Sequence, residues 1–137
     1  LQSLGFLSLF SGAFEEAIQH FMEAISISER AGVPQRTLAG LVHIGFSNWM
    51  LARFNKAEAA FKDTFELLEG MPESARIFPI TCYAEYLIIR GRYQEAKVQL
   101  QIAKTITSNF FIGHFLDIKV ACLSGSVAKL SLCGLAG

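Results

Sequence analysis

The chain has 137 residues, of which 52% are hydrophobic and 18% are charged, and its twelve basic and twelve acidic residues give a formal net charge of zero. This apolar content can offset the entropy lost on folding, which excludes a disordered chain, and the length suits one domain. A nucleic-acid-binding protein needs a cationic surface that displaces counterions from phosphates, so the balanced charge disfavours direct binding of DNA or RNA.

The cysteines are Cys82, Cys122 and Cys133, and no two of them form a CxxC pair. Disulfide frameworks of secreted proteins usually contain an even number of closely spaced cysteines. We therefore expect reduced, buried thiols and a cytoplasmic location. The sequence begins at Leu1 without a basic segment followed by an apolar block, so we interpret it as an internal part of a larger protein.

Apolar residues recur at helical spacing along the chain, and glycine or proline residues interrupt the pattern at intervals. No segment shows the alternation of a β-strand between turn signals. The pattern predicts seven or eight helices, over residues 2–11, 14–31, 35–52, 54–69, 73–90, 93–107, 108–124 and, in shortened form, 126–135.

One pattern of small, aromatic and apolar residues occurs three times in the same register. Its copies are 40 and 39 residues apart, measured between Ala17, Ala57 and Ala96. An apolar residue followed by a small one precedes each copy at a fixed distance, as Leu4–Gly5, Ile44–Gly45 and Tyr83–Ala84. The full copies are Gly12, Phe14, Ala17, Phe21 and Ala24; Ala52, Phe54, Ala57, Phe61 and Thr64; and Gly91, Tyr93, Ala96, Leu100 and Ala103.

Each copy predicts two helices, because positions i, i+4 and i+7 share a helix face. The turn between the two helices is expected at Gly12, Ala52 or Gly91, and the small residues would let the helices approach closely. Such a hairpin cannot bury both faces alone, so we expect the copies to stack within one domain, residues 1–137. The repeats are predicted at about 1–32, 34–70 and 73–107, with a partial repeat over 108–137.

These residues resemble the tetratricopeptide repeat, whose pattern is W-x2-L-G-x2-Y followed by A-x3-F and P. The match covers Leu1 to about Thr107. The period exceeds the usual length of about 34 residues. Elongated repeats of this kind are similar to those of bacterial multidomain signalling regulators of the large ATP-binding LuxR type and of kinesin light chains. The sequence departs from the pattern at the tryptophan and tyrosine places, which hold Leu1, Leu41 and Ile80, and Ser8, Asn48 and Leu87.

The resemblance implies an all-α fold of tandem antiparallel hairpins stacked as a right-handed α-solenoid, with the first helix of each hairpin lining the concave surface. That surface would be an apolar groove for a peptide or helix of a partner protein. Phe46 and Trp49 are the expected anchors. The alternative is that some of these side chains pack in the core. The expected partner-binding residues are Phe6, Phe10, Val42, Phe46, Trp49, Met50, Glu85 and Ile89.

Sequence patterns of catalytic and metal sites are absent, since the chain contains no HExxH, GxxxxGK[ST], GxSxG or GxGxxG. Glu16, His20 and Glu23 share a helix face. Di-iron bundles, however, use Glu-x-x-His on two helices, whereas Glu-x-x-x-His occurs once here. We therefore expect an exposed helix surface at these residues, no metal or other cofactor, and no enzymatic activity.

The sequence thus predicts a scaffold that binds a protein or peptide. The alternative is a regulatory sensor module within a multidomain signalling or transcription regulator. The most apolar stretch, residues 110–135, is interrupted by charged residues, so we expect no membrane span. We also expect self-association, because an incomplete repeat array exposes apolar surface. The residues expected to be most exposed at the C-terminal end are Leu130, Leu132 and Leu135.

Overall fold

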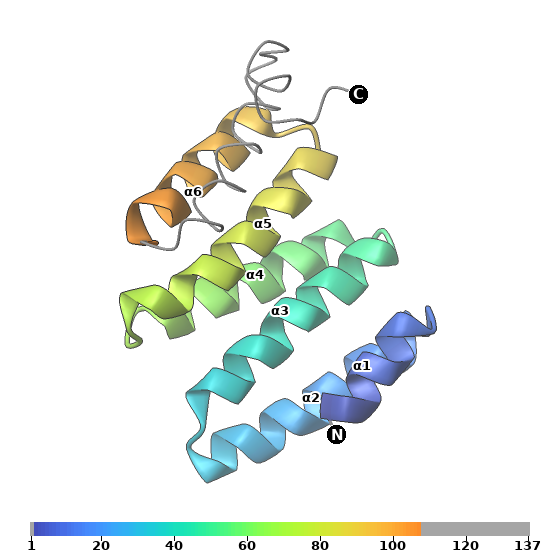
Figure 1. Ribbon diagram of the computed structural model, residues 1–137. Coiled ribbons are helices and arrows are strands. Elements are labelled where there is room, and N and C mark those ends of the chain that lie inside the picture. Colours follow the sequence, from blue (N-terminus) through green and yellow to red (C-terminus); the bar gives the residue numbers. More distant parts are fainter. Residues whose placement is uncertain (1, 108–137) are drawn as a thin grey trace. The chain divides into compact units, whose positions relative to one another are not determined.

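The structure is a computed structural model that describes residues 2–107 (Figure 1). These residues form six α-helices and one short 3-10 helix, and they include no β-strand. The prediction of an all-helical fold is confirmed for this part of the chain. The predicted helices over 108–124 and 126–135, like the other expectations for residues 108–137, lie outside it. The helices are α1 (Gln2–Phe10), α2 (Phe14–Ala31), α3 (Pro34–Met50), α4 (Phe54–Leu68), η1 (Glu73–Arg76), α5 (Ile77–Ile89) and α6 (Tyr93–Ile106).

The helix expected over residues 73–90 differs from the observed structure at its start. Residues Glu73–Arg76 form the 3-10 helix η1, and the α-helix begins only at Ile77. Pro79 explains this start, because proline has no backbone N–H and is tolerated in the first turn of an α-helix but not in its interior. An α-helix that began at residue 73 would place this proline in its second turn.

The chain divides into two compact units, residues 1–71 and 72–137. In the first unit α1 packs against α2, α2 against α3, and α3 against α4. Figure 1 shows α1 and α3 in front of α2 and α4, so this unit has two layers of helices. In the described part of the second unit, η1 leads into the antiparallel pair α5 and α6.

The turns α1–α2, α3–α4 and α5–α6 have the same backbone geometry. Gly12, Ala52 and Gly91 have φ angles of 80°, 57° and 75°, which lie in the left-handed region. In each turn the following residue donates a backbone hydrogen bond to the carbonyl five residues earlier, as from Ala13 to Ser8 at 2.8 Å. This is the Schellman pattern of a helix C-terminus. The prediction of three equivalent turns is confirmed.

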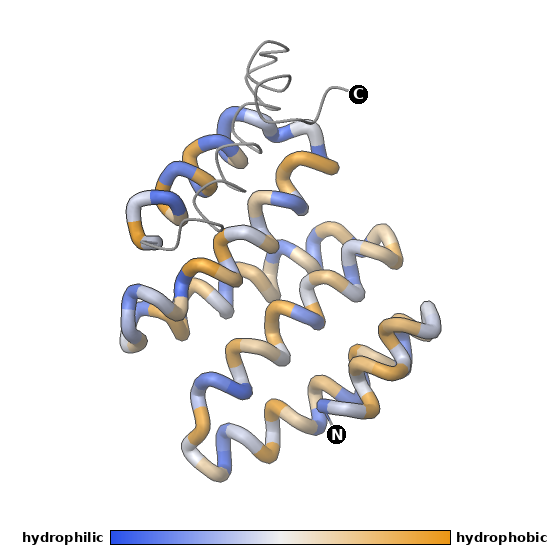
Figure 2. The backbone as a smooth tube through the Cα atoms, viewed as in Figure 1, coloured by the Kyte–Doolittle hydropathy of each residue, from blue (hydrophilic) through white to orange (hydrophobic). Residues whose placement is uncertain are grey.

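The small residues of the repeated pattern lie where the helices of each hairpin meet. A Cβ atom at Gly5 would lie 2.9 Å from the ring of Phe21, and one at Gly45 would lie 3.2 Å from the ring of Phe61. The pattern alanines of the second helices are fully buried (Ala17, Ala57 and Ala96). Figure 2 shows hydrophobic and hydrophilic residues alternating along α2 and α6, as expected for helices that bury one face.

Candidate partner-binding surface

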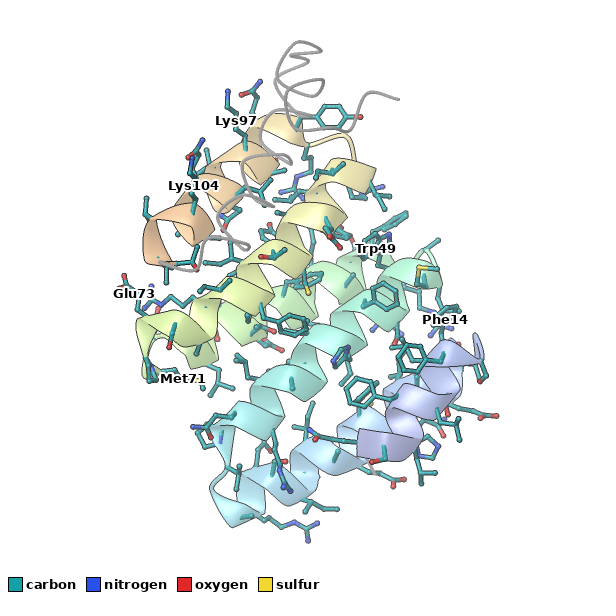
Figure 3. All side chains as sticks on the ribbon, in the orientation of Figure 1. Phe14, Trp49, Met71, Glu73, Lys97 and Lys104 are labelled. Atoms are coloured by element: carbon teal, nitrogen blue, oxygen red, sulfur yellow. The ribbon has the colours of Figure 1, made fainter. Side chains whose placement is uncertain are left out.

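Aromatic side chains of the first unit gather along α1 and α3. Phe6 and Phe10 lie one turn apart on α1 with ring centroids 6.5 Å apart, and the centroids of Phe46 and Trp49 on α3 are 5.4 Å apart. The ring of Phe14, the first residue of α2, lies 6.5 Å from that of Phe46. Figure 3 labels Phe14 and Trp49 near the C-terminal end of α3. The term aromatic surface is used below for Phe6, Phe10, Phe14, Phe46, Trp49 and Met50.

Exposure varies across the aromatic surface. Phe10 is 83% exposed and Met50 is 48% exposed. The other four residues are half-buried, so one part of each ring contacts the protein while another part contacts solvent. Anchored rings of this kind have little conformational freedom to lose when they bind, and clustered apolar exposure usually marks an interaction site.

A layer of rings beneath this surface joins α1 to α3. Phe6 packs edge-on against His43 and Phe21, with centroid distances of 4.7 Å and 5.5 Å, and His43 stacks on Phe21 at 5.1 Å. Desolvation by burial lowers the pKa of His43 below its ordinary value, which favours the neutral imidazole. Gln2 Nε2 also donates a hydrogen bond of 3.1 Å to the carbonyl oxygen of Arg36, at the start of both helices. These contacts place α1 and α3 side by side in the same direction.

The structure brings together five of the eight residues that the sequence predicted as partner-binding. These five are the members of the aromatic surface other than Phe14. Val42 is 1% exposed and offers no side-chain surface to a partner. It packs in the core, which was the alternative expected for some of the eight residues. Glu85 is half-buried and Ile89 is exposed, and both belong to α5 in the second unit. They therefore do not belong to the aromatic surface.

Phe14 is the residue of this surface that sequence reasoning did not include. The sequence analysis included Phe14 only in the repeated pattern, as the aromatic residue two positions after the turn at Gly12. Because α1 and α3 run side by side, the end of the first hairpin lies beside the end of α3, where Phe46 lies. The signal for Phe14 was thus its position next to the turn, combined with the stacking of two hairpins.

The described residues contain no group of three or more histidine, cysteine, aspartate or glutamate side chains that could hold a metal ion. Glu16 and Glu23 are exposed on α2, and His20 between them is half-buried. The Cys82 side chain is half-buried. Within residues 2–107 no helix is both long and apolar enough to cross a membrane.

No family model matches the chain, and no curated protein matches it significantly. The resemblance to the tetratricopeptide repeat therefore stays a prediction from the sequence pattern.

Proposed function

We propose that this chain is a protein-interaction module in which the aromatic surface binds an apolar peptide or helix of a partner protein. The exposure of Phe10 and Met50 beside the half-buried rings of Phe46 and Trp49 is the observation that supports this most directly. Covering these side chains would remove apolar area from water, at about 25 cal/mol for each Å² buried. Aromatic residues are also the side chains that most often dominate binding energy at interfaces.

The proposal includes the finer architecture predicted from the sequence, a right-handed α-solenoid of tetratricopeptide-like hairpins. It is supported by the same turn geometry at Gly12, Ala52 and Gly91 and by the buried small residues that repeat with it. The module acts by binding and catalyses no reaction. A cytoplasmic location also belongs to the proposal and is supported by the odd number of cysteines, no two of which form a CxxC pair.

The chemistry of the aromatic surface indicates what the partner segment should present. All six members are uncharged apolar side chains, so a charged group that faced them would lose water without gaining an ion pair. The partner should therefore present uncharged apolar side chains, spaced along one face of a helix or along an extended segment.

Short displayed peptide segments that are selected for binding to the full chain would provide a binding probe. Hydroxyl-radical oxidation of methionine side chains would then locate the site at which the probe binds. Met50 lies on the aromatic surface and is 48% exposed, whereas Met71 lies after α4, outside this surface, and is half-buried, so its oxidation serves as the control. A segment bound at the aromatic surface should slow the oxidation of Met50 and leave that of Met71 unchanged. Selected segments that never protect Met50 would contradict the proposal.

A further inference from the structure

A second surface of the first unit lies on the side of α3 that faces away from the aromatic surface. A groove of about 680 Å³ runs between α2 and α4, which form its walls, while α3 forms its floor. Ile44 lines this floor and Phe46 belongs to the aromatic surface. Residues two positions apart lie on opposite sides of a helix, since one turn takes about 3.6 residues. The two surfaces are therefore separate.

The interior of the groove is apolar. Leu41 and Ile44 lie on the floor, and two alanines of α4, Ala59 and Ala60, leave space at one wall. Met22, on the opposite wall, is 58% exposed, so it adds apolar surface that an occupant of the groove could cover. The other apolar side chains of the α2 wall are Ile18 and Ile25.

The two ends of the groove carry opposite charge. At the start of the two wall helices, Arg53 donates two hydrogen bonds to the Glu15 carboxylate, one of them at 3.0 Å, and Lys56 lies one turn further along α4. Two cations and one anion give this end a net positive charge. Glu29 and Asp63 line the groove toward its other end, which is therefore negative. Because Glu15 and Arg53 begin both helices, α2 and α4 run in the same direction, and their dipoles reinforce this polarity.

The dimensions of the groove favour a helix as its occupant. Arg53, directly before α4, and Asp63 on α4 are ten residues apart, which corresponds to about 15 Å, or about three turns of an α-helix. Polar residues of both walls, such as Gln19, Lys56 and Asp63, are exposed along this length, and the groove is open to solvent. A small molecule is usually held in a site that encloses most of its surface, whereas an amphipathic helix can lay one apolar face into an open groove.

From this geometry we infer that the groove between α2 and α4 binds an amphipathic helix of a partner protein. The bound helix carries a basic residue near its N-terminus and an acidic residue near its C-terminus, and it runs antiparallel to α2 and α4. In this orientation its basic end and the positive end of its dipole face Glu29 and Asp63. Its acidic end faces Arg53 and Lys56, while its apolar side chains cover Met22 and Ile44. This site is independent of the aromatic surface.

The probe for this site is a helical peptide of about 14 residues, which is about 21 Å long. It carries lysine in its first turn, leucine along one face and glutamate in its last turn. A control peptide of the same composition exchanges the lysine and glutamate positions. Fluorescence anisotropy with the full chain should show saturable binding of the first peptide and about tenfold weaker binding of the control. The first peptide should also protect Met22, and not Met50, from oxidation. Equal affinity for both peptides, or protection of Met50 alone, would overturn the inference.

Paired charge reversals test which residues of the groove determine the preference for one arrangement of charges on the peptide. The double variant Glu29→Lys with Asp63→Lys should weaken binding of the first peptide about tenfold and strengthen that of the control peptide. Glu16→Lys with Glu23→Lys makes the same change of net charge at exposed residues of α2 outside the groove, and it should leave both affinities nearly unchanged. An equal effect of both double variants would show that only net charge matters and would overturn the assignment. Trp49→Ala should not change binding of this peptide, so failure at one surface is distinguishable from failure at the other.

Discussion

Ala52 adopts a backbone conformation for which the two equivalent turns use glycine, at Gly12 and Gly91. Its φ of 57° lies in the left-handed region, which costs a residue with a Cβ atom about 1–2 kcal/mol. Gly12 and Gly91 have the corresponding angles without that cost, and beyond the adjacent residues a Cβ atom at either would meet no atom within 4 Å. Substitutions at these turns therefore report backbone conformation alone.

We predict that Ala52→Gly raises the free energy of unfolding by about 1 kcal/mol, because the left-handed conformation no longer carries a Cβ penalty. Gly12→Ala and Gly91→Ala should each lower it by a similar amount. Urea unfolding followed by circular dichroism measures all three variants. A change of the same sign at all three positions would contradict the equivalence of the turns.

His43 gives a second prediction at the residue scale. Burial lowers the pKa of His43 in the folded chain, whereas the unfolded chain retains the ordinary value of 6.5. The unfolded state therefore binds the proton more readily, so the free energy of unfolding should be greatest above pH 6.5 and decrease as the pH falls from there toward the folded-state pKa. His43→Phe, which keeps a ring against Phe6 and Phe21, should reduce this decrease below pH 6.5. If the free energy of unfolding of His43→Phe kept the same pH dependence, other titrating groups would be responsible for that dependence.

The sequence predicted the small residues at helix contacts more accurately than it predicted which side chains are exposed. The close contacts at Gly5 and Gly45 could be predicted because a small residue recurs at each position where two helices must approach. Val42 and Phe46 lie one turn apart on α3, so helical spacing alone gives both residues the same face. That one is buried and the other half-buried depends on tertiary packing that spacing does not encode.

At the scale of single elements, the alanine in the second turn of each second helix sets how closely a hairpin can pack. Ala57 and Ala96 are fully buried in α4 and α6. Ala57→Leu and Ala96→Leu should each lower the free energy of unfolding by about 1–3 kcal/mol, because the added methylene groups overpack the contact. Ala59→Leu, at an exposed position of α4, is the matched control and should change it by less than about 0.5 kcal/mol. Thermal unfolding in which Ala57→Leu behaves like the control would show that the alanine is not needed for packing.

Element boundaries could be predicted closely wherever glycine or proline marks them. The helix α2 was predicted with its observed bounds, because the turn at Gly12 precedes it and Gly32 follows it in the left-handed conformation. The start of α5 was not predicted, because residues 73–76 contain no glycine or proline that would mark a change from 3-10 to α geometry. Pro79 was the physical signal for that boundary.

For the whole molecule, the repeated helical hairpins could be predicted from the sequence, whereas the groove between α2 and α4 could not. The period of 39 to 40 residues predicted the hairpins of both units. The groove between α2 and α4 was not expected, because its walls come from two different repeats and its charges from residues with no pattern of their own. Such a site arises only when the hairpins are stacked.

The exposed side chains of α1 extend the prediction of self-association to the described residues. Leu4, Leu7 and Phe10 are 47%, 67% and 83% exposed, and α1 carries no charged residue that would oppose the approach of a second copy. Sedimentation velocity should show association that increases with concentration, and Leu7→Gln should reduce it because less apolar surface is then available. A monomer at all concentrations would contradict this prediction.

The central claim, binding of a partner through the aromatic surface, is tested most directly by comparing Trp49→Ala with the core variant Phe61→Ala. Phe61 is 1% exposed, so its truncation should lower the free energy of unfolding by about 3–5 kcal/mol. Trp49→Ala should keep the helical content and weaken binding of a selected apolar segment about thirtyfold, the equivalent of about 2 kcal/mol. Wild-type affinity in a folded Trp49→Ala variant would contradict the claim, and so would unfolding of Trp49→Ala to the same extent as Phe61→Ala.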